Sequence, residues 1–226
     1  MERYETGAVY QFTGFAVAAV NVGMQPIMLW AAMRSTVGPL LHAAAFAAAY
    51  VLADLVNGFI HMLLDNSDGY TSISGPFVAA FHLHHRTPVY RKRNVLLVYF
   101  FESGSKIWLA FYTIAAAALM WHGLVSPFAA LMLVYFSILS CLAEVSHYYC
   151  HTPTPVVPKM LASAWLLLPK RYHARHHVAD NTRYAFLNGM SNPVLNVIAR
   201  LFFKGYKTTT DLHYAAYTGK DTGNRS

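Results

Sequence analysis

Three histidines, His173, His176 and His177, stand within five residues of one another. On a helix they fall within about one turn, so their imidazoles can point towards a common centre, as metal ligation requires. Neutral imidazole binds iron, zinc, copper or nickel, whereas three protonated rings at this spacing would repel one another. A solvated basic turn is the competing interpretation, because lysine and arginine residues surround the triplet. Further histidines elsewhere in the chain favour the metal.

Three other stretches carry histidines, and they read HMLLD, FHLHH and HYYCH. If FHLHH forms a short helix, two of its histidines are adjacent and His82 points elsewhere. The eight that remain are His61, His84, His85, His147, His151, His173, His176 and His177. A structural zinc takes four ligands in a closed tetrahedron, so eight imidazoles suffice for two ions, each with room for an exogenous ligand. Two such ions at a membrane surface suggest iron and oxygen chemistry.

Carboxylates accompany these histidines at helical spacing. Asp54, Asn57, His61 and Asp65 form one polar stripe on an otherwise apolar segment. Ionisable groups at membrane depth are costly, so the stripe is expected to face the bundle interior and meet a partner. For Asp54, a packing hydrogen bond to a neighbouring helix is the plainer interpretation.

Two further carboxylates stand on the later apolar segments. Glu144 shares a helix face with His147 and His151, at spacings of three and seven residues. Glu102 and Lys106 are one turn apart, which predicts an ion pair within one helix, although Glu102 also remains a candidate ligand.

The composition excludes an ordinary soluble domain. The chain has 226 residues, of which 56% are hydrophobic and 12% charged, and its mean hydropathy is +0.33. Apolar runs long enough to cross a bilayer lie at about 8–33, 39–64, 95–121 and 124–147. We therefore expect one all-α integral membrane domain with about four transmembrane helices.

Shorter segments are expected to form a histidine-rich cap on this bundle. FHLHHRTP predicts a short helix ended by Pro88. KMLASAWLLLP is too short to span and is expected to lie in the membrane interface, and NPVLNVIARLFFKGY predicts a further surface helix. Residues 207–226 form a polar tail.

The net charge of +7 is placed unevenly along the chain. Basic residues lie between the second and third apolar runs and after the fourth, whereas the opposite side holds little beyond Arg34. The positive-inside rule then places both termini and the histidine clusters on the cytoplasmic side. Basic residues that flank apolar runs fit anionic lipid headgroups better than a nucleic acid.

The motifs, taken in order, resemble those of a known family. ADLVNGFIHMLLDN, HHRTP, HYYCHT and LPKRYHARHHVADNTRYAFLNGMSNP are similar to successive motifs of the Kua-like lipid desaturases, which include plasmanylethanolamine desaturase and the bacterial CarF proteins. A plastid desaturase that acts on phosphatidylglycerol palmitate looks like a more distant relative. The resemblance covers about residues 50–200.

This resemblance implies a non-haem di-iron membrane desaturase, which uses O2 and two external electrons to remove hydrogens from the alkyl or acyl chain of a lipid. The family's metal motifs fall on the eight histidines. Asp54, Asp65, Glu144 and Asp180 would orient them through hydrogen bonds or add a ligand. Relatives often have a residue other than histidine at the position of His82. His82 is therefore a further candidate, as a histidine that compensates for positions where this chain departs from the family pattern. This chain departs from the family pattern at Asn94, Val95 and Asp180.

Two alternatives remain open at this point. A di-iron lipid or fatty acid hydroxylase would use the same centre, and a non-catalytic membrane metal-binding protein would use the same ligands. The chain shows no C-x-x-C-H motif and no glycine-rich dinucleotide loop, so we expect a separate electron donor of the cytochrome b5 or ferredoxin kind. The basic residues of the cap are suited to an acidic carrier.

Overall fold

The computed structural model describes residues 7–34, 37–72, 75–86 and 94–205. All regular structure in these ranges is helical, which confirms the all-α prediction. Pro88, the basic run before Asn94 and the polar tail fall outside the described residues. The elements are α2 (Ala8–Met33), α3 (Pro39–Asp65), α4 (Gly75–Arg86), α5 (Val95–Glu102), the 3-10 turn η1 (Ser103–Ser105), α6 (Ile107–Trp121), α7 (Pro127–His151), α8 (Val156–Ser163), α9 (Lys170–Ala174) and α10 (Asn192–Phe202).

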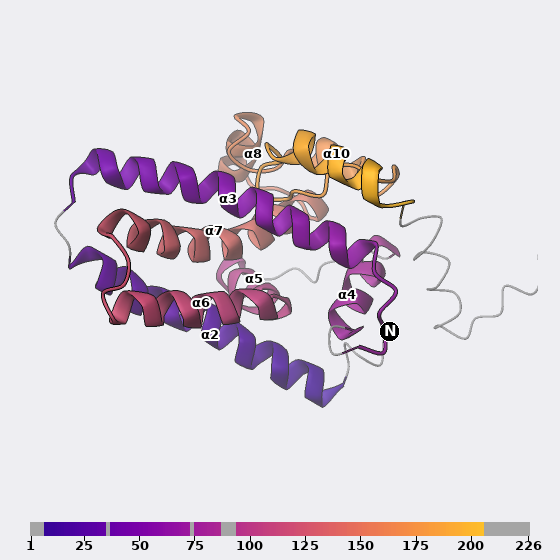
Figure 1. Cartoon of the computed structure of the whole chain (residues 1–226). Coiled ribbons are helices and arrows are strands. Elements are labelled where there is room, and N and C mark those ends of the chain that lie inside the picture. Colours follow the sequence, from indigo (N-terminus) through magenta and orange to yellow (C-terminus); the bar gives the residue numbers. More distant parts are fainter. Residues whose placement is uncertain (1–6, 35–36, 73–74, 87–93, 206–226) are drawn as a thin grey trace, which may run out of the picture.

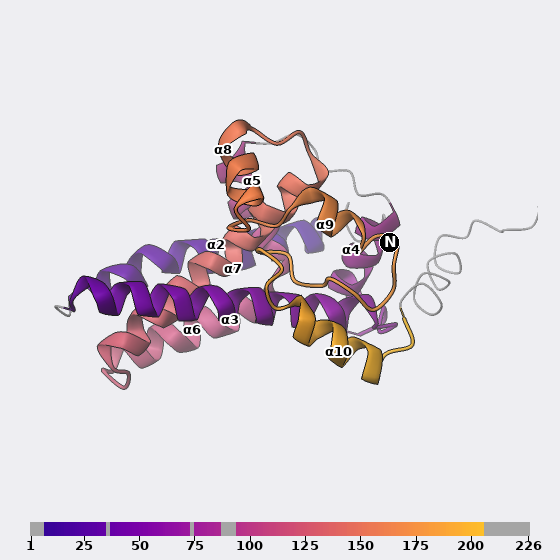
Figure 2. The same ribbon diagram turned by 90° about the horizontal axis from the view of Figure 1, so that it is seen from above.

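Long helices form a bundle, and the shorter helices α4, α9 and α10, with the loop between α9 and α10, lie at one end of it and are called the cap (Figures 1 and 2). Helices α2, α3 and α7 are long and apolar enough to cross a membrane. Figure 1 shows them with α6 in the bundle, and Figures 1 and 2 both place α4 and α10 near the end of α3. Pro39 and Pro127 stand in the first turns of α3 and α7, where a missing N–H leaves no hydrogen bond unmade.

The predicted third span is not one straight helix. Helices α5 and α6 meet at an angle of 94°, so the described chain has three candidate spans, or four if the bent pair counts as one. Helix α6 alone has 15 residues and is about 22 Å long, which is less than the thickness of a hydrocarbon core. The expectation of a continuous helix over 95–121 was therefore wrong.

Small residues and a distant amide account for this break. Gly104 lies against Gly14 of α2, so closely that a Cβ at position 104 would overlap the α2 backbone. Asn21 of α2 donates from Nδ2 to the carbonyls of Ser103 and Lys106, at 2.9 and 3.2 Å. These bonds satisfy carbonyl groups at the break, which is what a bundle interior requires.

Alanines bring α3 and α7 close together. Ala45, Ala49 and Ala53 lie one turn apart along α3 and have no exposed surface. Ala49 and Ala53 share a buried cluster with Ala143 of α7. Small side chains let helix backbones approach in a membrane, and here they hold the histidine-bearing ends of α3 and α7 side by side.

Asp54 attaches the cap to α3. Its carboxylate is fully buried and accepts hydrogen bonds from the backbone N–H groups of Asn188, Gly189 and Ser191, at 2.9–3.0 Å. The sequence left a role at the metal site and a bond to a neighbouring helix as alternatives for Asp54, and the observed partner is a loop. Three N–H donors satisfy a buried carboxylate well, so this contact fixes the segment that follows the last histidines.

Ser146 and Gly58 make two further attachments. Ser146 Oγ of α7 donates to the carbonyl of Leu187 at 2.7 Å and accepts from the N–H of Leu168 at 2.9 Å. Gly58 of α3 faces α10 and the loop before it, where an added Cβ would lie 2.6 Å from Leu195 and 2.7 Å from Ala185. The cap is thereby held against both helices.

Candidate metal centre

Four segments that are distant in sequence bring their histidines together. Helix α3 supplies His61 near its end, α4 supplies two histidines, α7 supplies two in its last turns, and α9 with the turn after it supplies three. The side chains form two groups of possible metal ligands, each with ligand atoms within 4.8 Å of one another. The five-histidine group contains His84, His147, His151, His173 and His177, and the aspartate group contains His61, Asp65, His85 and His176.

The five-histidine group is arranged around nitrogen atoms that face one another. Nε2 of His173 lies 3.1 Å from Nε2 of His147, 2.9 Å from that of His151 and 3.0 Å from that of His177. The ring of His84 stands 4.6 Å, between centroids, from the rings of His147 and His151. One hydrogen can join a pair of imidazoles, but it cannot satisfy several nitrogens that converge.

The aspartate group is arranged around one carboxylate. Asp65 Oδ1 lies 3.0 Å from Nε2 of His85, and Oδ2 lies 3.2 and 3.3 Å from Nε2 of His61 and His176. Nε2 of His176 is also 3.3 Å from that of His85. Asp65 has no exposed surface. One carboxylate therefore faces three imidazoles in the interior.

These separations fit a bound ion. Two nitrogens that each lie about 2.1 Å from one metal, at angles of 90–109°, are separated by roughly 3.0–3.4 Å. The separations of 2.9–3.3 Å in the structure lie in this range or at its edge. The donor chemistry, imidazole with one carboxylate, suits iron and related divalent metals.

The two groups adjoin. The rings of His85 and His177, one from each group, have centroids 4.8 Å apart, and those of His61 and His147 are 6.3 Å apart. A pair of ions held by these groups would therefore be neighbours.

Backbone carbonyls orient two of the rings. Nδ1 of His61 lies 2.8 Å from the carbonyl of Tyr184, and Nδ1 of His176 lies 2.8 Å from that of Thr182. A carbonyl only accepts, so each Nδ1 donates, and the neutral ring keeps the lone pair of Nε2 for the site. Second partners of this kind fix the ring orientation of metal-binding histidines.

The cap histidines are held in the neutral form that binds a metal. Burial lowers the pKa of His84 and His173 well below the usual value, and neighbouring imidazoles lower each pKa further. The same causes lower the pKa of His177 to about 2. Burial lowers the pKa of His176 to about 4, although the neighbouring carboxylate of Asp65 acts in the opposite direction. All four rings are therefore neutral at pH 7.

Four other candidates stand outside both groups. His82 points away, as expected: its Nδ1 contacts the hydroxyl of Tyr70, and its Nε2 lies 2.9 Å from the carbonyl of Asp65. Asp54 binds loop N–H groups, and Asp180 lies against Gly205. Glu144 pairs with Lys106 at 2.9 Å.

The contacts of Lys106 and the backbone partners of the rings were missed from sequence. Lys106 was predicted to pair with Glu102 within one helix, but the helix break turns it towards Glu144 of α7 instead. A lone lysine in an apolar run was the available signal. The carbonyls of Tyr184 and Thr182 have no sequence signal, because any residue type supplies the same acceptor.

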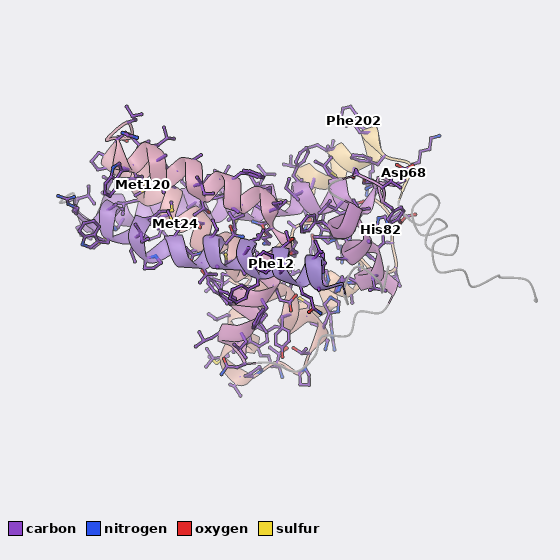
Figure 3. The ribbon with its side chains drawn as sticks, turned by 90° about the horizontal axis from the view of Figure 1, so that it is seen from below. Phe12, Met24, Asp68, His82, Met120 and Phe202 are labelled. Carbon is purple, nitrogen blue, oxygen red and sulfur yellow. The ribbon has the colours of Figure 1, made fainter. Side chains whose placement is uncertain are left out.

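A separate cavity of about 320 Å³ lies between α2 and α6 and has an apolar lining. Its lining includes Met24 and Met120, which Figure 3 shows at the opposite end of the molecule from His82. It therefore has no part in the metal centre.

The comparisons with known proteins agree with this geometry. The model of the lipid desaturase domain matches residues 50–207, a region that contains all nine residues of the two groups. The chain belongs to this family. No solved structure matches.

Curated relatives come from Arabidopsis thaliana. The chain is 30% identical to "Fatty acid desaturase 4, chloroplastic" over 161 residues, which are 68% of this chain and 47% of the relative. It is 31% identical to "Fatty acid desaturase 4-like 1, chloroplastic" over 173 residues, 68% of this chain and 52% of the relative. The chain thus spans about half the length of the curated relatives it matches.

Proposed function

We propose that this chain is a membrane di-iron lipid desaturase, which introduces a double bond into the alkyl or acyl chain of a lipid. The reaction consumes one O2, two electrons and two protons, converts a C–C single bond into a double bond and releases two molecules of water. The observation that carries this proposal is the convergence of eight imidazoles and Asp65 into two adjoining groups.

The number and kind of donors favour two irons over one structural zinc. Each group offers four or five donors, and a mixture of imidazole and carboxylate with room for a further ligand is typical of non-haem iron. A structural zinc would be closed by four ligands and would leave five of these nine side chains unused. When bound, the iron pair supplies O2 activation and the oxidising power for removing hydrogen.

The protein's own residues provide a dry and rigid setting. His61, His176 and Asp65 are at most 1% exposed, so water has little access to the aspartate group. The backbone carbonyls behind His61 and His176 keep Nε2 directed at the site. Preorganised ligands avoid rearrangement during the reaction. The apolar helices guide the lipid chain.

The electron donor is proposed to dock beside α9. Lys170, Arg171 and Arg175 are exposed on α9 and the turn after it, next to the last histidines. A basic surface accelerates the approach of an acidic carrier such as cytochrome b5 or a ferredoxin. The rate of reduction by such a carrier should fall as the salt concentration rises. It should fall further in the triple variant Lys170→Glu/Arg171→Glu/Arg175→Glu. A rate that does not depend on salt would contradict the docking site.

The metal centre and both termini are proposed to face the cytoplasm, because the basic residues flank the spans on that side. The variant Arg175→Cys in oriented vesicles tests this with a thiol-reactive label that does not cross the membrane. The new cysteine should react from the cytoplasmic side, and reaction from the opposite side only would reverse the topology.

Two classes of lipid are candidates for the substrate. The names of the relatives concern fatty acids, whereas the motif resemblance includes plasmanylethanolamine desaturation. Lipid mass spectrometry of cells with and without the chain distinguishes an acyl double bond from a vinyl ether. Loss of two hydrogens supports a desaturase, and gain of one oxygen would establish the alternative hydroxylase. If the lipid profile is unchanged although an electron donor is supplied, the alternative of a non-catalytic metal-binding protein is the one supported.

Histidine substitutions test whether the centre carries the activity. His84→Ala, His147→Ala and His176→Ala should each lower desaturation at least 100-fold while the protein still accumulates in membranes. His122→Ala is the matched control, because His122 lies beyond the end of α6 and lines the distant cavity. Full activity in two of the three site variants would contradict the ligand assignment.

A further inference from the structure

The ammonium group of Lys106 is buried and fully paired. Its side chain is only 5% exposed, and Nζ lies 2.5 Å from Asn57 Oδ1, 2.5 Å from the carbonyl of Ser140 and 2.9 Å from Glu144 Oε1. An ammonium has three N–H donors, and three acceptors from two helices meet them. A buried charge persists only when it is paired in this way.

This network stands about one helical turn beneath the metal centre. Asn57 precedes His61 by four residues on α3, and Glu144 precedes His147 by three on α7. Nζ of Lys106 also lies 5.0 Å from the centroid of the Phe186 ring. That ring in turn stands 5.5 Å from the ring of His61 and 5.2 Å from that of His147.

The second oxygen of Glu144 faces a metal-site histidine. Glu144 Oε2 lies 3.9 Å from Nδ1 of His147, while Nε2 of His147 points into the five-histidine group. His61 and His176 each have a backbone carbonyl 2.8 Å behind Nδ1 and the site before Nε2. For His147, a carboxylate oxygen lies on the corresponding side of the ring at the longer distance of 3.9 Å, as an electrostatic contact and not a hydrogen bond.

We propose that Lys106 is a positioning residue for the five-histidine group, acting through Glu144 on His147. Lys106 holds one oxygen of Glu144, so that the other stays behind Nδ1 of His147 and favours the tautomer whose Nε2 can bind a metal. Lys106 stands at the 94° bend itself, as the residue that precedes α6. The inference rests on the proposed metal centre, and it adds a residue that no histidine motif contains.

Three variants test this proposal. Lys106→Met removes the ammonium and keeps the length of the side chain, and Glu144→Gln removes the carboxylate charge. Because Lys106→Met alone leaves an unpaired buried carboxylate and can fail to fold, the double variant Lys106→Met/Glu144→Gln removes both charges together. Gln25→Met is the matched control: Gln25 is buried, bonds the carbonyl of Ser137 and Sγ of Cys141 on the same helix α7, and contacts no histidine of the centre.

The first readout needs no metal. The protein is labelled with 15N-histidine and treated with a chelator, and the His147 signals are assigned as those that disappear in His147→Gln. In the wild type, the 15N chemical shifts of the His147 ring should show that the hydrogen is on Nδ1. They should show a mixture of tautomers in the double variant. Wild-type shifts in a folded double variant would overturn the proposal, whether or not the protein binds iron.

The second readout is the affinity for Fe(II), measured by titration of the same metal-free proteins. The double variant should bind more weakly by about 10- to 100-fold at the five-histidine group, and Gln25→Met should bind as the wild type does. A double variant that melts earlier but keeps wild-type affinity would show that the network only supports folding. A wild type that binds no iron, with the tautomer change still present, would refute the proposed function and leave the positioning of His147 intact.

Discussion

Two buried aspartates on the same stripe of α3 perform different tasks. Asp65 faces three imidazoles, whereas Asp54, three turns earlier, accepts three backbone N–H groups of the cap. Their spacing predicted a shared inward face, because helical periodicity fixes direction. It could not predict their partners, because these belong to segments that fold back from far along the chain.

Asp65 should determine how many irons the protein holds. Asp65→Asn removes the carboxylate charge that faces His61, His85 and His176, so the aspartate group should lose its ion while the five-histidine group keeps the other. Elemental analysis of the purified variant should give about one iron per chain instead of two. Asp68→Asn, on the exposed loop after α3, is the control and should retain both. Two tightly held irons in Asp65→Asn would exclude it as a ligand.

At the scale of elements, the sequence located the helices but not the bend between α5 and α6. Apolar runs are readable because the bilayer sets their length. The bend depends on Asn21 and Gly14, which meet Ser103 and Gly104 from 82 and 90 residues later in the chain. A local pattern of serine and glycine indicates weakness in a helix, but only a partner at the right depth makes a break stable.

Gly58 tests the fit between α3 and the cap. In Gly58→Ala the new Cβ would lie 2.6–2.8 Å from Leu195 and the backbone of Ala185, so α10 and its loop must move. Such overpacking should lower the free energy of unfolding by about 1–3 kcal/mol and reduce desaturation. Thermal melting in detergent measures the first effect.

Gly23→Ala is the matched control, because Gly23 lies within α2 and nothing would stand within 4 Å of an added Cβ. There alanine should be neutral or slightly stabilising, as usual in a helix. Equal melting temperatures for the two variants would show that the cap does not pack against Gly58 in the way described.

At the scale of the whole molecule, the eight histidines selected from the sequence are those of the two groups, and His82 lies outside them. The sequence indicated these eight histidines because all of them lie at one end of the predicted bundle. It could not divide the set, since adjacent histidines point in different directions: His84 and His177 belong to the five-histidine group, and His85 and His176 to the other. That division depends on the short α9 and on how α4 lies against α3.

The metal-free protein should be sensitive to acid. The pKa of His84, His173, His176 and His177 is lowered in the folded chain, so the unfolded chain takes up protons first. Stability is therefore full at pH values well above 6.5 and falls as pH decreases through 6.5, for His176 towards pH 4 and for His177 towards pH 2. Each ring contributes a slope of about 1.4 kcal/mol per pH unit within its window. Melting temperatures of chelator-treated protein at pH 9, 8 and 5 should be similar for the first two and clearly lower at pH 5; a constant or rising value would contradict the neutral buried rings.

The metal content of the purified wild-type protein tests the central claim most directly. Iron, zinc and copper should be measured per chain in protein extracted from membranes under mild conditions, with Mössbauer spectra of 57Fe-grown material. Two irons per chain are predicted, in two environments, because one group has five imidazoles and the other three with a carboxylate. A single zinc, or a folded protein that takes up no iron, would contradict it.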